Sequence, residues 1–163
     1  MSITIQQPQP YDLVGDIVQV AGLAGGAFES NFSYEISEGH DEVSGNFMAG
    51  YLGAHDQFQF ASDTSSAGFS LSRAFLRVYH QSARDGSILD EVLVPILLGN
   101  RIWPGFKGYR EYTVQAGDTL WSIATDQMGA GVNYHALAAA NQPAVSDPDS
   151  ISVGQVLRVP YRD

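Results

Sequence analysis

Several short segments in the first hundred residues alternate apolar with polar positions, the period-two pattern of a half-buried β-strand. Turn signals such as Gly39–Asp41 and Asp85-Gly86 separate them. Six or seven strands at this spacing predict an antiparallel β-sandwich, with Pro95 at a sheet edge. The expected strands are Ile17–Gly22, Phe32–Ile36, Val43–Ala49, Gln57–Phe60, Ala74–Gln81 and Leu89–Leu98.

The last fifty residues change to a mixed pattern. Tyr112 and Val114 alternate with polar neighbours, and Leu120, Ile123 and Ala124 then share one face of a helix. The expected elements are a strand at Tyr112–Gln115, a helix from about residue 119, a second helix at about 133–140 and a strand at Gln155–Val159, ended by Pro160. A βααβ unit of this size can bury one small core. It leaves no room for an enclosed active site, which indicates a binding module.

Three glycines and one proline between the two regions indicate a linker. Three bases interleaved with Trp103, Phe106 and Tyr109 could contact nucleic acid or another anionic polymer. The acidic surroundings instead favour packing of these aromatics against one or both domains. The predicted boundaries are a sandwich at 1–98, a linker at 99–111 and a second domain at 112–163.

Coupled residues recur at fixed spacing in the C-terminal unit. They are the opening Tyr-x-Val-x-x-Gly-Asp-Thr-Leu-Trp-x-Ile-Ala, Asn141, and the closing Ile-x-x-Gly-Gln-x-Leu-x-Val-Pro. From Tyr112 to Pro160 the unit resembles the LysM (lysin motif) domain. The resemblance implies a small α+β (βααβ) fold that binds glycans containing N-acetylglucosamine, chiefly peptidoglycan and chitin. One departure is the glycine-containing loop Met128–Asn133, which is absent from the shortest LysM domains.

The resemblance implies a shallow groove between the loop after the first strand and the loop before the last. The candidate glycan-binding residues are Gly117, Asp118, Thr119, Leu120, Asn141, Asp147, Asp149 and Ile151. Loop backbone groups and a short Asp or Thr side chain would pair with the amide and carbonyl of an N-acetyl group. Leu120 or Ile151 would touch its methyl.

Structural roles compete with ligand contact at several of these positions. Gly117 could serve only the turn geometry, and Asp118 or Thr119 could serve only to cap the following helix. Trp121 could stack on a sugar. Its helical spacing with neighbouring residues favours packing, so it is not included among the candidates.

The N-terminal half carries turns and core positions of a second family. They comprise Val14–Glu29, the strand Asn31–Ser37, and Arg84–Ser87 leading to Val92-x-Val-Pro95. Over roughly residues 3–98 they resemble the bacterial immunoglobulin-like domain of the Gmad type, named for its occurrence in spore germination and sporulation proteins. Such domains are taken to be adhesive or assembly modules. The resemblance implies a sandwich that docks an unknown protein partner.

The charge is unevenly distributed along the chain. Residues 1–100 hold 12 acidic and 3 basic side chains, while residues 101–163 hold 6 and 5. The acidic half argues against nucleic acid or an anionic membrane as a partner. No stretch has the length needed to span a bilayer, so membrane insertion is not expected. There is no cysteine, which excludes disulfides and thiolate metal sites.

The N-terminal residues Met1–Pro8 have neither the basic region nor the apolar run of a signal peptide. The expected location is therefore the cytoplasm, or the cell envelope if a leader was removed. Export by a route that reads no N-terminal signal is a third alternative.

Local motifs of common enzymes are missing from the sequence. It contains no Gly-x-Ser-x-Gly, no His-Glu-x-x-His and no phosphate-binding glycine loop. The glycine-rich run Gly22–Gly26 joins two expected strands and predicts a turn. His40, His55, His80 and His135 are scattered singly, without metal-ligand spacing. No enzymatic activity, cofactor or metal is expected.

Two functions remain open. In the first, the chain is a non-catalytic binding protein whose LysM unit recognises glycan while the sandwich provides adhesion or docks a partner. In the second, it is an assembly scaffold, cytoplasmic or part of a phage-tail-like particle, whose LysM unit mediates protein contacts. The intact Gly-Asp-Thr-Leu loop favours the first, and the missing leader favours the second.

Overall fold

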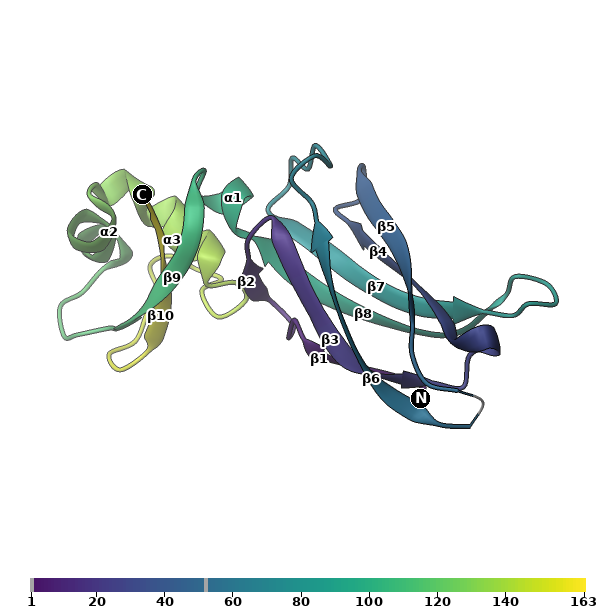
Figure 1. Ribbon diagram of the computed structural model, residues 1–163. Helices are drawn as coiled ribbons and strands as arrows, with labels where there is room; N and C mark the ends of the chain where they lie inside the picture. Colours follow the sequence, from purple (N-terminus) through teal and green to yellow (C-terminus); the bar gives the residue numbers. More distant parts are fainter. Residues whose placement is uncertain (1, 52) are drawn as a thin grey trace.

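The computed structural model describes residues 2–51 and 53–163. Its N-terminal part is a sandwich of a three-stranded and a five-stranded sheet, as expected (Figure 1). The first sheet has the order β1-β3-β6 and comprises β1 (Ile3–Gln7), β3 (Ile17–Gly25) and β6 (His55–Asp63). The second has the order β2-β8-β7-β4-β5 and comprises β2 (Asp12–Val14), β4 (Asn31–Ser37), β5 (Glu42–Met48), β7 (Arg73–Gln81) and β8 (Ile88–Leu98). A short 3-10 helix, η1 (Phe28–Ser30), connects β3 to β4.

Alternating inward side chains of the two sheets form the core of the sandwich. Phe32 and Ile36 of β4 are fully buried, and so are Leu76 and Val78 of β7. On the opposite sheet Phe58 is buried, and its ring centroid lies 4.4 Å from that of Phe47. The period-two pattern in the sequence therefore identifies the buried faces of β4 and β7 correctly.

The glycine-rich run at 22–26 is not the turn that the sequence predicts, because Gly22–Gly25 lie within β3. A Cβ added at Gly22 would lie 2.1 Å from the carbonyl oxygen of Thr4 on β1. Glycine here allows the neighbouring strand to approach closely rather than reversing the chain.

Pro95 does not lie on an outermost strand, because β8 has β7 on one side and β2 on the other. Its carbonyl accepts a hydrogen bond from the Tyr11 N–H at 2.7 Å, on the β2 side. The nitrogen of a strand residue points to the same side as its carbonyl, so the missing N–H interrupts no bond to β7. The parallel pairing with β2 begins one residue later, at Ile96.

The C-terminal domain has the expected βααβ order. It comprises β9 (Phe106–Thr113), α2 (Leu120–Met128), the 3-10 helix η2 (Gly131–Asn133), α3 (Tyr134–Ala140) and β10 (Val156–Arg162). The strands pair as a two-stranded antiparallel sheet, and Val114, Ile123, Leu137 and Leu157 pack between this sheet and the helices. No helix within the described ranges is long and apolar enough to cross a membrane.

The linker predicted at 99–111 is corrected by the structure. Helix α1 (Gly99–Ile102) follows β8 directly, and Phe106–Glu111 belong to β9, whose pairing with β10 extends to Phe106 opposite Arg162. Glycines and alternating bases made this part of the strand resemble a flexible segment. Trp103 and Phe106 are buried, which confirms packing for these two aromatics, whereas Tyr109 is 43% exposed.

A small third core joins the two domains. Leu13 and Leu97 of the sandwich meet Phe106 and Ala140 of the C-terminal domain. The Arg158 guanidinium, on β10, donates a hydrogen bond to the Tyr11 carbonyl at 2.9 Å. The joint is therefore a packed contact with its own buried side chains.

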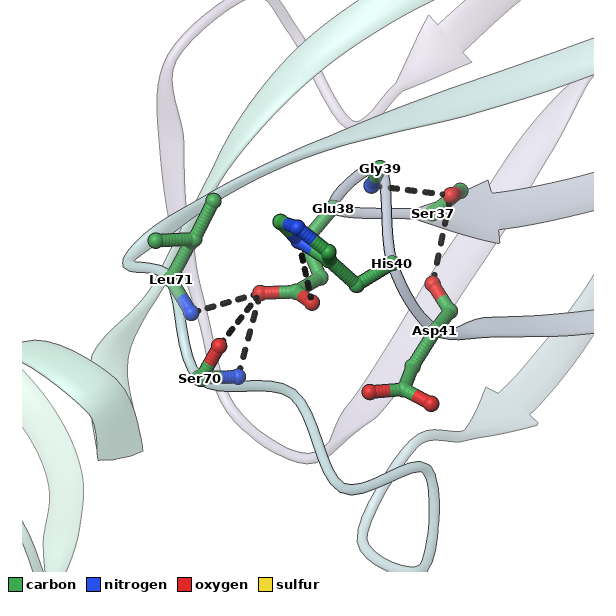
Figure 2. Close-up of polar contacts among 7 residues, drawn as sticks. All are labelled: Ser37, Glu38, Gly39, His40, Asp41, Ser70 and Leu71. Atoms are coloured by element: carbon green, nitrogen blue, oxygen red, sulfur yellow. Dashed lines mark hydrogen bonds and ion pairs between the residues drawn. The ribbon is translucent and has the colours of Figure 1, made fainter.

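The buried carboxylate of Glu38 lines a pocket together with Tyr11 and Leu97, and Figure 2 shows its polar contacts. The side chain of Glu38 is fully buried, and its Oε2 accepts hydrogen bonds from the N–H groups of Leu71 at 2.6 Å and Ser70 at 3.0 Å. His40 Nδ1 lies 3.7 Å from Oε1. The Leu71 N–H, followed by the bonds from Ser70, holds the pKa of Glu38 below its ordinary value. Glu38 thereby ties the β4–β5 turn to the segment that leads into β7.

We expect Gly99→Ala to loosen the joint without unfolding either domain. The added Cβ would lie 2.3 Å from Cδ1 of Phe106, so the ring must leave its position, at about 1–3 kcal/mol. Limited proteolysis should then produce new cleavage between residues 99 and 106. The control is Gly15→Ala, whose added Cβ has no neighbour within 4 Å. Unchanged cleavage of the Gly99→Ala protein would contradict this role of the Phe106 contact.

The contribution of Glu38 to stability should depend on pH. Its folded-state pKa lies below the ordinary 4.5, so the contribution is fully present above about pH 4.5 and is lost as the pH falls through the folded value. We therefore expect the stability difference between wild type and Glu38→Gln, from urea unfolding, to be constant near neutrality and to shrink in acid. A difference that grows in acid would exclude this linkage.

Candidate functional site

The loop after β9 is held by Asp118. Its Oδ2 accepts hydrogen bonds from the Gln115 N–H at 2.8 Å and from the Tyr112 hydroxyl at 2.7 Å. These two donors, the Gln115 N–H first, lower the pKa of Asp118, and the same carboxylate raises the pKa of Tyr112. Both bonds use Oδ2, so Oδ1 remains available at the surface of the loop.

Thr119, not Asp118, caps helix α2. Its hydroxyl accepts the Ser122 N–H at 3.0 Å, and the Ser122 hydroxyl accepts the Thr119 N–H at 3.0 Å, a reciprocal capping box. The next two N–H groups, of Leu120 and Trp121, have no partner within the part of the chain that the structure describes. The first turn of α2 therefore offers two backbone donors.

A groove of about 460 Å³ lies between this first turn and the loop before β10. Its lining residues are Asp118, Thr119, Leu120, Trp121, Tyr134, Pro148, Asp149 and Ile151. Five of the eight residues proposed from the sequence are among them: Asp118, Thr119, Leu120, Asp149 and Ile151. The structure thus brings together the two loops that the resemblance indicated.

The other three candidates do not line the groove. Asn141 is 5% exposed, and its side chain donates to the carbonyls of Leu137 and Arg158 and accepts the Arg158 N–H at 2.7 Å. Three hydrogen bonds of its amide thus join α3 to β10, and Asn141 lies outside the lining of the groove. Gly117, at φ 86°, supplies the turn, and Asp147 accepts the Asp149 N–H at 3.0 Å and shapes its own loop.

Two aromatic residues of the groove were not among the candidates. Trp121 is 55% exposed, and its ring centroid lies 6.0 Å from that of Tyr134. The ring rests against Gly131, where an added Cβ would lie 2.1 Å from Cε2. Trp121 therefore packs along one edge and exposes the rest. Its position next to buried Leu120 was a sequence signal that it points away from the core.

The groove combines hydrogen-bond donors and acceptors with the surface of an aromatic ring. It offers free helix N–H donors, the carboxylates of Asp118 and Asp149, and the Trp121 ring, and no basic side chain lines it. Within the described residues, no group of three or more His, Cys, Asp or Glu side chains could hold a metal ion.

Comparison with known families agrees with this architecture. Residues 2–87, more than half of the chain, match the immunoglobulin-like domain of bacterial spore germination. The chain belongs to this family. Residues 112–160 match the LysM domain, and all the residues that line the groove lie within that match. Both are families of non-catalytic domains.

The potassium binding protein Kbp of Escherichia coli O6:H1 strain CFT073 is similar to part of this chain. It is 45% identical over 49 residues, which cover 30% of this chain and 33% of Kbp. The chain therefore spans about a third of the length of that relative.

The capping box predicts a stability effect at Thr119. Replacing Thr119 with Ala removes the acceptor for the Ser122 N–H and should lower the free energy of unfolding by about 0.5–2 kcal/mol.

Asp118→Asn leaves this cap in place and should instead shift the pKa of Tyr112 back toward 10, which NMR titration of the Tyr112 ring would measure. An unchanged Tyr112 titration would contradict the Asp118 contact.

Proposed function

We propose that this chain is a non-catalytic binding protein whose LysM groove recognises glycan containing N-acetylglucosamine, such as peptidoglycan or chitin. The observation that carries the proposal is the groove itself, which combines the free N–H groups of Leu120 and Trp121 with an exposed indole. The sandwich serves as the adhesion or partner-docking module.

The polar atoms of the groove suit an N-acetyl group. The N–H groups of Leu120 and Trp121 can donate to its carbonyl oxygen, because a helix N-terminus favours an acceptor. Asp118 Oδ1 or a carboxylate oxygen of Asp149 can accept its amide N–H. Ile151, which is partly exposed, provides the apolar contact for its methyl.

The aromatic wall suits a chain of sugars. Trp121 and Tyr134 present ring surface along one side of the groove, and the C–H face of a pyranose can cover it. A second or third sugar that extends from the first would add contact with the protein. Affinity should therefore increase with oligomer length.

The assembly-scaffold function remains the alternative. It predicts that the same LysM surface contacts protein, and that glycan leaves it unperturbed. The name of the relative Kbp raises potassium as a further ligand, so the titrations should be made in matched KCl and NaCl. A difference in glycan affinity between the two salts would show that the cation takes part in binding.

Titration with N-acetylglucosamine oligomers tests the glycan proposal. We expect amide shifts at Asp118–Trp121, Tyr134, Asp149 and Ile151, and tighter binding with each added sugar. Trp121→Ala should weaken binding about tenfold, because losing roughly 50 Å² of buried ring at ~25 cal/mol per Å² amounts to ~1.3 kcal/mol. The control is Tyr109→Ala, since Tyr109 is a half-exposed aromatic on β9 that does not line the groove.

The titration can also reject the proposal. No shift with either chitin oligomers or soluble peptidoglycan fragments would support the assembly function instead. Equal weakening by Trp121→Ala and Tyr109→Ala would remove the groove from the binding site.

A further inference from the structure

The end of the sandwich farthest from the LysM domain exposes large apolar side chains. Phe28 of η1 is 61% exposed, Met48 at the end of β5 is 73% exposed and Tyr51 is 79% exposed. Figure 1 shows η1, which precedes β4, together with the end of β5 and the start of β6 at this end, opposite α2 and α3. We call the surface formed by Phe28, Met48 and Tyr51 the distal tip. Exposed apolar groups gathered in this way are typical of an interaction site.

Two residues of the distal tip, Met48 and Tyr51, line a hollow of about 350 Å³, while Phe28 lies outside its lining. Buried Ala27, Ala49 and Ser30 form its floor, and Met48 and Tyr51 form part of its rim. The Ala49 N–H donates to the Ser30 carbonyl at 3.0 Å, which ties η1 to the end of β5 beneath the hollow. The floor is thus fixed by backbone bonding and can receive one apolar side chain.

The backbone beside the hollow is strained. Glu29 and Ser30 have φ values of 53° and 59°, in the left-handed region that non-glycine residues rarely adopt. Such conformations are energetically unfavourable and gather at binding sites. They direct η1 across the end of the sandwich and so shape the wall of the hollow.

The charge around the hollow is acidic. Glu29 and Asp56 line it, no Lys or Arg does, and neither carboxylate forms an ion pair within the described residues. None of the three bases of the sandwich lines the hollow: Arg73 and Arg77 lie on β7, and Arg84 lies in the β7–β8 turn, at the same end of the sandwich as the hollow (Figure 1). An occupant that neutralises Glu29 and Asp56 must therefore bring its own positive charge.

We propose that the distal tip docks a protein segment that inserts one apolar or aromatic side chain into the hollow and places Lys or Arg beside Glu29 and Asp56. This inference deepens the docking function proposed for the sandwich and is independent of glycan binding. The hollow and the LysM groove lie in different domains, so one chain can hold both ligands at once.

Panning of a phage-displayed random dodecapeptide library on the intact chain tests the proposal. We expect enriched peptides with an aromatic or aliphatic residue flanked by Lys or Arg. A synthetic peptide of the consensus should bind at least tenfold more weakly to Met48→Ser/Tyr51→Ser and to Glu29→Gln/Asp56→Asn, and more weakly at high salt. The matched controls are Leu93→Ser, an exposed apolar position on β8, and Asp41→Asn/Glu42→Gln before and in β5.

Three results would overturn the proposal. They are the absence of enrichment, equal binding to the tip and control variants, and enriched peptides without basic residues. Sedimentation of the chain alone provides a further check. Self-association that Met48→Ser/Tyr51→Ser abolishes would identify a second copy as the occupant and reject a basic partner. Because no glycan is present, failure here would leave the glycan proposal untouched.

Discussion

The contact between the Phe106 ring and Gly99 is the constraint on which the two-domain arrangement depends. Gly99 is the first residue of α1, directly after β8, and Phe106 is the first residue of β9. Their contact therefore joins the two ends of the short segment that connects the domains. Without a Cβ at residue 99, the ring can settle against the backbone and complete the core with Leu13, Leu97 and Ala140. The LysM domain is therefore held against the sandwich rather than tethered to it.

The sequence predicted elements whose periodicity is strong. The strands around Phe32, Phe58 and Leu76 and the βααβ order follow from alternation and helical spacing, which report burial on one face. It missed β1, although Ile3-Thr4-Ile5 alternates apolar and polar positions, and it missed the three-residue β2, which is too short for a pattern of its own and is defined by its pairing with β8. It also assigned Phe106–Glu111 to a linker, because these residues become a strand only by pairing with β10, which lies far along the chain and leaves no local signal.

The candidate site residues, like the strands, could be predicted only in part from the sequence. Asp118, Thr119 and Ile151 could be placed in one groove because the motif fixes the loops that carry them. Asn141 could not be told from a ligand residue, since a motif marks positions that matter for folding as strongly as those that touch ligand. Its bonds to Leu137 and Arg158 belong to the fold. Distinguishing the two roles requires the hydrogen-bond partners, which only three-dimensional structure supplies.

The glycine-containing loop between the LysM helices acquires a physical role from the structure. Gly131 lies against the Trp121 indole, and Asn133 donates to the Met128 carbonyl at 2.9 Å, which closes the loop beneath the ring. A ring held along one edge loses less conformational entropy when ligand covers its exposed face. The extra loop, which the shortest LysM domains lack, thus supports the aromatic wall of the groove. A side chain at residue 131 would displace the Trp121 ring while leaving the polar half of the groove intact.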